Sequence, residues 1–292
     1  MTAAKTLRRR AFAKVNLGLE ITGRRADGYH DLVTIFQTIE LADEITVTSA
    51  PPGTLTLAAD PALGGAQNLV LRAARALVAQ SGTKRGAALT LTKGIPVAAG
   101  CGGGSSDAAA ALLALRELWR LPTTDAELAT IAARLGADVP FFLRGGTALA
   151  TGIGERLTPL PPQSKSWFVL VTPRLDLPAD KTRRLYGALG ADDCSDGTRT
   201  LDQAARLRRN EPIDPALLVN SFAAPLARLF PALAAWQARI LAAGASFVQP
   251  SGSGPTLYTV APTQDTARAI ARTLANTDAT IAVARSVKGG TA

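Results

Sequence analysis

The sequence predicts two α+β domains, and three observations lead to this prediction. The chain has 292 residues, which is more than one typical hydrophobic core needs. Its expected strands and helices do not follow the regular β–α–β order of a Rossmann sheet. A proline-rich stretch, PLPPQSKS at residues 159–166, interrupts the pattern near the middle. We therefore expect one domain at residues 1–160 and a second at 161–292.

In the first domain, apolar alternation predicts strands and capping residues mark two helices. One helix is expected between Asn68, its N-cap, and Gly82, just past its end. Another follows Thr124 and Glu127, which form a capping box, and ends at Gly136. The expected strands cover residues 7–22, 31–41, 43–50, 53–60, 86–97 and 145–157, the last with turns.

The second domain also mixes strands and helices. It is expected to begin with a buried strand at residues 167–173, and a polar loop is expected near 192–197. Residues 246–262 read as strand, glycine turn and strand, and residues 279–287 as a last strand. The expected helices cover residues 199–209, 215–229, 232–243 and 263–276.

The composition excludes a disordered chain, because 47% of the residues are hydrophobic and only 19% are charged. The net charge of +9 favours an anionic partner. Basic residues are scattered, however, and their densest groups, Arg8–Arg10, Arg183–Arg184 and Arg206–Arg209, are shorter than a basic tail. With 5% aromatic residues as well, a small anionic ligand is favoured over nucleic acid. Salt-dependent binding of DNA or RNA would mark that alternative.

The two cysteines, Cys101 and Cys194, form no disulfide framework and have no metal-ligand spacing. With one histidine in the chain, a histidine-rich metal site is excluded. The first apolar stretch is interrupted by Lys14, Asn16 and Glu20, so it predicts neither a signal peptide nor a membrane span. We expect a protein of the reducing cytoplasm.

A glycine-rich segment precedes one of the best predicted helices. It reads IPVAAGCGGGSSDAAAALLAL over residues 95–115, and helical spacing of apolar residues begins at Ala108. Ser105 or Ser106 can cap this helix, with Asp107 in its first turn. A helix N-terminus carries unpaired N–H groups and a partial positive charge, and glycines allow a ligand to approach the backbone closely. The segment therefore predicts a polyphosphate cradle, with a simple flexible turn as the alternative.

This cradle does not match the common nucleotide-binding motifs. No lysine follows the glycines, as a P-loop requires, and Ser105 stands where the dinucleotide motif has its third glycine. The G-x-S-x-G motif of α/β-hydrolases is also absent from this segment. The nature of the site therefore has to come from the motif as a whole.

That motif, PVAAGCGGGSSDAA, resembles the central motif of the GHMP kinases, which transfer a phosphoryl group from ATP to small molecules. Within them, the chain resembles the 4-diphosphocytidyl-2-C-methyl-D-erythritol kinases in three more segments. The resemblance implies an ATP-binding N-terminal domain, a ferredoxin-like C-terminal domain, and phosphorylation of the acceptor's 2-hydroxyl on the non-mevalonate route to isoprenoid precursors. The segments are AKVNLGLEITGRRADGYHDLVTIFQTI, LGADVPFFLRGGTALATGIGE and PSGSGPTLYTV, at residues 13–39, 135–155 and 250–260.

The resemblance implies that Lys14 and Asp138 form the catalytic pair. Asp138 would take the proton of the acceptor hydroxyl, while Lys14 would hold that aspartate and stabilise developing negative charge. A cation beside a carboxyl group keeps it ionised, which suits a base. Outside this motif context, a solvated lysine on a strand and an aspartate in a turn would be the simpler interpretations.

The same resemblance implies an ATP site that also uses Mg²⁺. Ser105 or Ser106 could help to place the metal, and no protein-only metal site is expected. For Asn68 and Lys93, which match positions near the base, a helix cap and a solvated lysine remain alternatives. The implied ATP-binding residues are Asn68, Lys93, Pro96, Val97, Ala98, Ala99, Gly100, Cys101, Gly102, Gly103, Gly104, Ser105 and Ser106.

Three residues are implied on the acceptor side. Tyr29 would stack on the cytosine, His30 would hydrogen-bond to it, and Asn16 would lie near the methylerythritol end beside Lys14. An aromatic face with a donor–acceptor ring can read the edge of a base. The partner is thus a small cytidine diphosphate derivative, with no nucleic acid and no membrane, and the protein is expected to be a monomer or a homodimer.

Three positions depart from the family pattern. Cys101 stands where leucine is commoner, Ser221 where an acidic residue often follows the asparagine, and Pro250 precedes the third motif. We expect Cys101 to be buried and inert, and Pro250 to alter how the chain enters its loop. The rival functions are a mevalonate or homoserine kinase, which the RADGYH segment opposes, and an inactive scaffold, which Lys14 and Asp138 together oppose.

Overall fold

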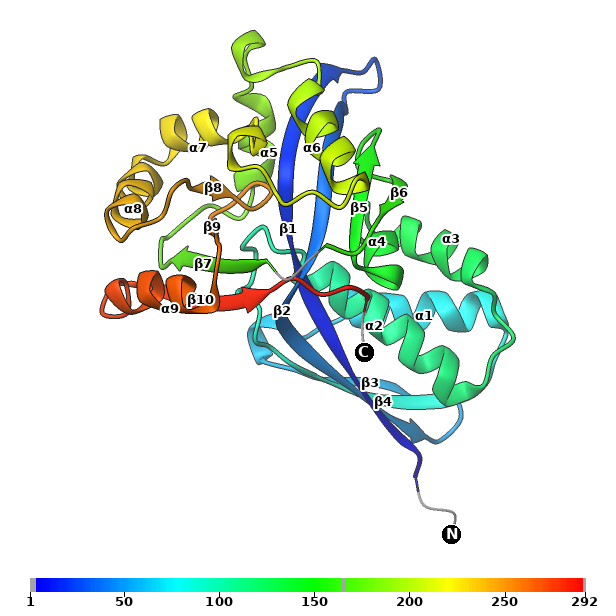
Figure 1. The fold of residues 1–292 in the computed structure, drawn as a ribbon. Helices are drawn as coiled ribbons and strands as arrows, with labels where there is room; N and C mark the ends of the chain where they lie inside the picture. Colours follow the sequence, from blue (N-terminus) through cyan, green and yellow to red (C-terminus); the bar gives the residue numbers. More distant parts are fainter. Residues whose placement is uncertain (1–3, 164–165, 291–292) are drawn as a thin grey trace.

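The computed structural model describes residues 4–163 and 166–290, and its first half is a mixed sheet flanked by helices (Figure 1). Two long strands, β1 and β2, run through the molecule, and α1, α2 and α3 lie together on one side of the lower sheet. The strands are β1 (Thr6–Arg24), β2 (His30–Ala50), β3 (Leu55–Ala58), β4 (Gly86–Thr92), β5 (Thr147–Thr151) and β6 (Arg156–Leu160). The helices are η1 (Pro61–Leu63), α1 (Leu69–Ser81), α2 (Gly103–Trp119), α3 (Asp125–Leu135) and α4 (Val139–Arg144).

The first sheet has the strand order β3-β4-β2-β5-β6, with β1 paired to β2. All neighbours are antiparallel except β3 and β4. The separate strands predicted at 31–41 and 43–50 are one strand, β2. Its register against β1 shifts where Phe12 pairs with Ala42 and Ala13 with Ile39. A β-bulge therefore lies close to the break that the sequence pattern predicts, and the strand continues through it.

The predicted helix signals of this half are confirmed. Asn68 caps α1 by accepting a hydrogen bond from the Val70 N–H at 2.8 Å, and Gly82 ends the helix in the left-handed conformation. Thr124 and Glu127 form both bonds of the capping box of α3. Apolar faces of α1, α2 and α3 pack on the sheet in a core that includes Trp119.

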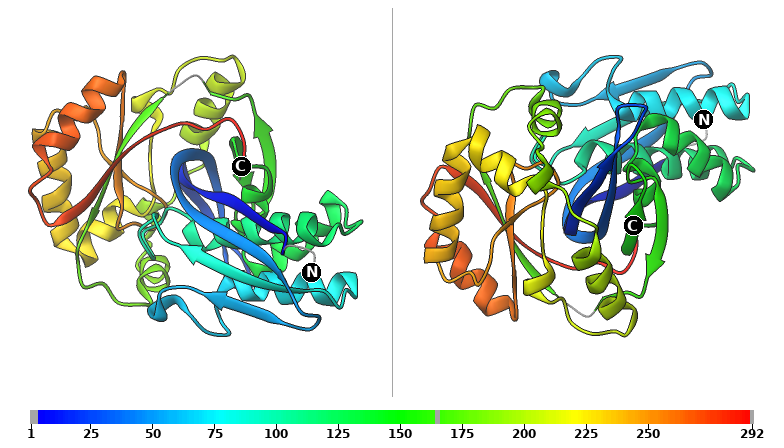
Figure 2. Two further views of the ribbon diagram at one scale, coloured as in Figure 1. Left: turned by 90° about the horizontal axis from the view of Figure 1, so that it is seen from below. Right: turned by 90° about the horizontal axis from the view of Figure 1, so that it is seen from above.

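The second half contains the ferredoxin-like arrangement expected from the resemblance. Its sheet has the order β10-β7-β9-β8 with antiparallel neighbours, and its chain order is β–α–β–β–α–β. Helices α8 and α9 lie on the outer side of this sheet in both views of Figure 2. The strands are β7 (Trp167–Pro173), β8 (Gln249–Pro250), β9 (Leu257–Ala261) and β10 (Ala279–Arg285). The helices are α5 (Lys181–Gly187), η2 (Ala191–Asp193), α6 (Thr198–Arg208), η3 (Pro215–Leu217), α7 (Ala223–Leu229), α8 (Pro231–Ala242) and α9 (Gln264–Thr273).

One helix prediction in this half is wrong, and two short α-helices, one in each half, were not predicted. Residues 215–229 form η3, an extended link and α7 instead of one helix. The link is extended because the Leu19 N–H donates to the Val219 carbonyl at 2.9 Å, and the Ser221 N–H donates to the Leu19 carbonyl at 2.8 Å. Helices α4 and α5 have six and seven residues, too few to give a clear apolar period.

The two halves share a hydrophobic core. Val15 and Leu17 of β1 belong to one buried cluster with Phe168 of β7 and Tyr258 of β9. Farther along β1, the buried carboxylate of Glu20 accepts hydrogen bonds from the Ser195 hydroxyl at 2.7 Å and the Thr200 N–H at 2.6 Å. The long hairpin of β1 and β2 is therefore embedded in both halves.

The segment after β10 returns to the first half. The Val287 N–H donates to the Thr38 carbonyl of β2 at 2.9 Å, and the Gly146 N–H donates to the Gly289 carbonyl at 3.2 Å. The division expected at residue 160 falls where β6 ends at Leu160, although residues 164–165 of the proline-rich stretch lie outside the described residues. Within the described ranges, no helix combines the length and apolar character needed to cross a bilayer.

Candidate active site

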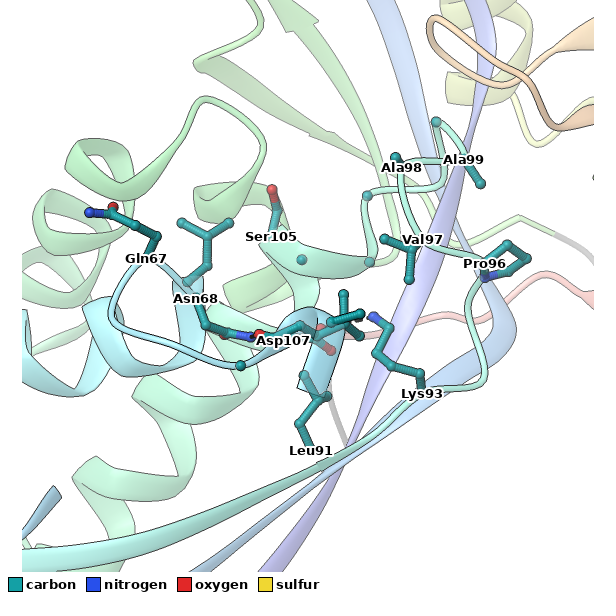
Figure 3. Close-up of a pocket in the computed structure, with 18 residues that line it drawn as sticks. Gln67, Asn68, Leu91, Lys93, Pro96, Val97, Ala98, Ala99, Ser105 and Asp107 are labelled. Atoms are coloured by element: carbon teal, nitrogen blue, oxygen red, sulfur yellow. Dashed lines mark hydrogen bonds and ion pairs between the residues drawn. The ribbon is translucent and has the colours of Figure 1, made fainter. Parts of the chain in front are cut away.

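The glycine-rich segment lines a cavity of about 500 Å³ between the end of β4, the start of α2 and the start of α1 (Figure 3). Helix α2 begins earlier than predicted, at Gly103, with Gly102 as an N-cap that has no side-chain capping bond. The predicted caps Ser105 and Ser106 are wrong, since both lie inside the helix, and Asp107 lies beyond its first turn. The first N–H groups of α2 therefore keep free hydrogen-bonding capacity at this cavity.

Backbone conformation explains why glycines are needed here. Gly100 and Gly102 have φ angles of +81° and +71°, and Ala98 also has a positive φ, of 53°. A Cβ atom on Gly102 would lie 2.6 Å from the Phe142 ring and 3.2 Å from the Lys14 side chain. The loop thus packs closely on Lys14 without blocking the cavity.

Lys93 lies at the same cavity but is paired. Its ammonium group forms an ion pair with Asp43. It forms another with Asp107, at 2.9 Å, and Lys93 and Asp107 are both labelled in Figure 3. Asp43 also accepts hydrogen bonds from the N–H groups of Gly94 and Ile95, both at 2.7 Å. Burial raises the pKa of Asp107, and the charge of Asp43 raises it further. The start of the glycine-rich loop at residues 94–105, which we call the phosphate loop, is thereby fixed to β2 and α2.

Eleven of the thirteen implied ATP-binding residues line this cavity, and two do not. The side chain of Cys101 is buried in the core shared by the two halves, and burial raises the pKa of its thiol. Ser106 is fully buried and its hydroxyl has no hydrogen-bond partner. Asn68 lines the cavity and caps α1 at once, so its two interpretations are compatible. The lining members are Asn68, Lys93, Pro96, Val97, Ala98, Ala99, Gly100, Gly102, Gly103, Gly104 and Ser105.

A second cavity, of about 280 Å³, contains Lys14, Asn16 and Asp138. The Lys14 ammonium donates to the Asn16 amide oxygen at 2.6 Å, and the Asn16 amide nitrogen donates to the Thr34 hydroxyl at 2.8 Å. Thr34 in turn donates to the Gly18 carbonyl at 2.6 Å. All three side chains are buried, so this chain of bonds fixes the orientation of Lys14.

Asp138 reaches this cavity from the start of α4, where it is the N-cap residue but makes no capping bond. Its carboxylate therefore faces the cavity half-buried. The direct ion pair between Lys14 and Asp138 that the resemblance implies is absent, since no contact within 4.0 Å joins their charged atoms. The two groups share one cavity without touching, which leaves room for a hydroxyl between them.

A third cavity, of about 780 Å³, carries Tyr29 and His30. Tyr29 is 61% exposed, and His30 stacks on Tyr186 of α5 with ring centroids 5.1 Å apart. Tyr186 packs edge-on against Phe222, and burial together with the nearby charge of Asp138 raises its pKa. Sequence reasoning missed Tyr186, whose signal was its rarity: the chain has three tyrosines.

The third glycine-rich motif, residues 250–256, lies against the first loop. The Ser251 hydroxyl donates to the Gly100 carbonyl at 3.0 Å, and the Thr256 N–H donates to the Ala99 carbonyl at 3.2 Å. Pro250 belongs to β8 and pairs with Leu257, so it enters the loop as ordinary strand. Ser221, the other departure noted from the sequence, accepts a hydrogen bond from the Ile21 N–H at 3.0 Å.

The three cavities adjoin one another. The first and second share Gly100 and Gly102. The second and third share Ala137, Ile153, Thr182 and Tyr186. One continuous cleft therefore leads from the phosphate loop, past Lys14 and Asp138, to the aromatic pocket.

Comparison with known proteins identifies the family of this chain. Residues 68–146 match the GHMP kinases N terminal domain, and residues 203–279 match the GHMP kinases C terminal domain. A 4-diphosphocytidyl-2-C-methyl-D-erythritol kinase of Moorella thermoacetica is 41% identical over 91% of this chain and 94% of its own. Its counterpart in Geobacter metallireducens is 39% identical over 93% and 95%.

Solved structures agree. A crystal structure of a 4-(cytidine 5'-diphospho)-2C-methyl-D-erythritol kinase superposes with a TM-score of 0.82 at 38% identity, covering 97% of this chain and all of its own. A homoserine kinase of Cytophaga hutchinsonii, at 17% identity and a TM-score of 0.77 over 100% and 98% of the two chains, shares the fold alone. The chain belongs to the 4-diphosphocytidyl-2-C-methyl-D-erythritol kinases of the GHMP kinase family.

Proposed function

We propose that this protein transfers the γ-phosphoryl group of ATP to the 2-hydroxyl of 4-diphosphocytidyl-2-C-methyl-D-erythritol, a step of the non-mevalonate route to isoprenoid precursors. The observation that carries this proposal is the continuous cleft. A cradle for a polyphosphate and a pocket for a base meet at a cavity that holds a buried lysine and an aspartate. Two anionic ligands in one cleft also suit the net charge of +9.

On the ATP side, the backbone does most of the binding. The free N–H groups at the start of α2 and the left-handed glycines Gly100 and Gly102 would surround the β- and γ-phosphates. Asn68 and Lys93 also line this cavity, and they would lie near the base of the nucleotide. The paired state of Lys93 favours a role in holding the loop as well as in contacting the nucleotide.

Lys14 and Asp138 would carry the transfer. Asp138 accepts the proton of the 2-hydroxyl while that oxygen forms a bond to the γ-phosphorus, and the bond from this phosphorus to the bridging oxygen breaks to release ADP. The proton then passes from Asp138 to solvent. Lys14, oriented by Asn16 and Thr34, stabilises the negative charge on the transferred group. No direct contact between Lys14 and Asp138 is needed for either role.

The site also suits Mg²⁺ that arrives with ATP. Within the part of the chain that the structure describes, no cluster of three or more His, Cys, Asp or Glu side chains could hold a metal ion by itself. Magnesium needs only one or two protein oxygens when phosphates supply the rest. Ser106, whose buried hydroxyl lacks a partner, or the adjacent Ser105 would supply one. When bound, the metal neutralises charge on the β- and γ-phosphates.

On the acceptor side, the cytosine would enter the third cavity. The exposed ring of Tyr29 and the stacked pair of His30 and Tyr186 offer aromatic faces and a donor–acceptor edge. The diphosphate would then lie near Thr182, which lines both acceptor cavities, and the methylerythritol end would lie beside Asn16. The two free cysteines suit a reducing cytoplasm, to which we assign the reaction. The protein is proposed to act as a monomer or a homodimer.

The testing experiment measures ADP release with ATP, Mg²⁺ and the cytidyl acceptor, beside mevalonate, homoserine and galactose. Turnover of the cytidyl acceptor alone is expected. Asp138→Asn should lower kcat by roughly 10²–10⁴-fold, the usual contribution of a positioned base, while ATP still binds. Asp265→Asn in the distant helix α9 is the matched control and should keep full activity. Turnover of another acceptor instead would refute the assignment of Tyr29 and His30.

A further inference from the structure

A buried lysine lies next to the second and third cavities, which we call the acceptor cavities, and no role has been described for it so far. Lys181, the first residue of α5, is 6% exposed. Its ammonium group donates to the carbonyls of Ser253 and, at 2.8 Å, Gly254, and to the Ser253 hydroxyl at 3.2 Å. Across residues 4–163 and 166–290, no carboxylate lies within 4.0 Å of it.

An arrangement of this kind is costly unless its hydrogen bonds are used. Removing an ammonium group from water without a counter-ion is unfavourable, and the burial lowers the pKa of Lys181 to about 8. An apolar side chain of similar length could fill the same space at lower cost. All three donors of Lys181 instead fasten the loop at residues 253–254, so the bonds themselves are the feature to explain.

The loop that Lys181 holds reaches the reacting end of the cleft. A Cβ atom on Gly252 would lie 3.3 Å from the Lys14 ammonium nitrogen and 3.2 Å from the Gly100 carbonyl oxygen. The Ser251 hydroxyl donates to that same carbonyl. With glycine at position 252 the loop lies close beside Lys14, and the Ser251 hydroxyl bonds it to Gly100, so a shift of this loop would alter the surroundings of both residues.

The helix that carries Lys181 reaches the other end of the cleft. The Thr182 hydroxyl, one residue on, lies 2.9 Å from the Ser253 hydroxyl and lines both acceptor cavities. Tyr186, one turn farther, stacks on His30 in the aromatic pocket. Lys181 thus joins α5, which would contact the cytidyl group, to the loop at residues 250–256, which lies beside Lys14.

We propose that Lys181 is a positioning residue that couples occupation of the cytidyl pocket to the placement of the glycine-rich loop against Lys14 and Gly100. This inference rests on the proposed function for the identity of the acceptor. Binding of the cytidyl group orders α5, and Lys181 transmits that order to the loop through its three hydrogen bonds. The coupling acts on the reacting groups, so its loss lowers kcat more than it weakens ATP binding.

The first measurement is steady-state kinetics of Lys181→Met, which keeps the length of the side chain and removes its donors. We expect kcat to fall by about 10–100-fold with the KM for ATP within about threefold, as expected for an interaction realised in the transition state. Lys181→Arg, which keeps the charge and the donors, should recover part of the loss. Arg184→Met is the matched control, because Arg184 lies on the same helix and is 58% exposed. An unchanged kcat in Lys181→Met would overturn the proposal, even if its Tm were lower.

A second measurement does not depend on turnover. CDP binding is measured with and without a non-hydrolysable ATP analogue, in the wild type and in each Lys181 variant. The wild type should bind CDP several-fold more tightly with the analogue, and the factor should approach one in Lys181→Met. No coupling in the wild type, or equal coupling in the variant, would overturn the proposal. If Lys181→Met does not fold, Ser253→Ala removes one of the three acceptors and should reduce the same factor.

Absence of wild-type turnover with intact coupling between CDP and the ATP analogue would refute the proposed acceptor and leave the role of Lys181 standing. Normal wild-type turnover with no coupling would do the reverse. The two proposals can therefore fail separately.

Discussion

The two glycine-rich loops of this protein have similar composition and use their polar groups in opposite ways. The first, residues 94–105, leaves the N–H groups at the start of α2 without capping partners, and most of its residues line a cavity. The second, residues 250–256, has its carbonyls occupied by protein groups: Asn220 donates to Pro250 and Gly252, and Lys181 to Ser253 and Gly254. Glycine content alone therefore does not identify a ligand-binding loop. The two loops differ at the N–H groups that begin α2, which have no capping partner, whereas the Ala99 and Gly100 carbonyls of the first loop are themselves paired with the second.

The comparison also shows what the second loop is for. Glycines of both loops allow the loops to approach each other, since a Cβ atom on Gly252 would lie 3.2 Å from the Gly100 carbonyl oxygen. A Cβ atom on Gly100 would lie 2.0 Å from the Ser251 carbonyl oxygen, which is closer than any real contact. The second loop therefore packs against the first loop and holds it in place through hydrogen bonds to Gly100 and Ala99.

The largest effect is expected where the two loops meet. Gly100→Ala would force a side chain into a left-handed conformation, which costs about 1–2 kcal/mol, and against the Ser251 carbonyl. We expect ATP affinity to fall at least about tenfold and Tm to fall by about 2–4 °C for each kcal/mol lost. Isothermal titration and thermal unfolding would measure both.

Gly104→Ala provides the contrast within the same loop. Gly104 lies in α2, and the nearest atom to its Cβ position is Leu69 Cδ1 at an ordinary 3.5 Å. Alanine favours a helix by about 0.8–1 kcal/mol over glycine, so Tm should stay or rise. Equal Tm losses in the two variants would contradict the distinction between close loop contact and open cavity.

A smaller effect is expected from loosening the supporting loop alone. Asn220→Ala removes the donors to the Pro250 and Gly252 carbonyls, both at 2.9 Å, at a buried position. The free energy of unfolding in urea should fall by roughly 1–3 kcal/mol, the cost of unsatisfied buried groups. The KM for ATP should change little, because the first loop keeps its own bonds. The exposed Asn276→Ala is the control, and a variant as stable as the control would show that the carbonyls need no donor.

The last expected effect, which concerns stability and not ATP binding, is a pH dependence at the base of the first loop. Because the pKa of Asp107 is raised in the folded protein, its ionisation costs stability, and this cost grows as pH rises above the pKa of the unfolded chain. Asp107→Asn removes that dependence. The stability of the wild type relative to the variant should therefore decrease between pH 5 and pH 8, by up to about 1.4 kcal/mol per pH unit until the pH reaches the folded pKa of about 7. Urea unfolding at both pH values would measure it, and an increase in relative stability would contradict the raised pKa.

Much of the fold could be predicted because its signals are local. Caps such as Asn68 and the box of Thr124 and Glu127 involve residues two or three positions apart. Two of the predictions that failed depended on distant partners. Residues 215–229 have helical composition, but pairing of Val219 and Ser221 with Leu19 makes part of them extended. Likewise, β2 continues through the break predicted between residues 41 and 43, because β1 pairs with the residues before and after it.

The candidate site divides in the same way. Residues in contiguous motifs, such as Lys14 and Gly102, were accessible from the sequence, and the structure brings their motifs together in one cleft. Tyr186 and Lys181 were not, since they lie on a seven-residue helix in a stretch without a motif. Their significance comes from contacts with His30 and with residues 253–254, which no local pattern encodes. Nor could the sequence reveal that Lys93 is bonded to two carboxylates from separate elements.

The segment after β10 has a consequence for the synthesis of the protein. Thr38 and Gly146 of the first half receive partners from residues 287 and 289. A ribosome adding about 5–20 residues per second exposes Thr38 on the order of ten to fifty seconds before it reaches the segment that completes the edge around it. During translation, Thr38 and Gly146, in the half that carries Lys14 and Asp138, thus remain without these hydrogen-bond partners until that segment is made. Synthesis of the segment after β10, rather than completion of the first domain, is the step that supplies the partners of Thr38 and Gly146.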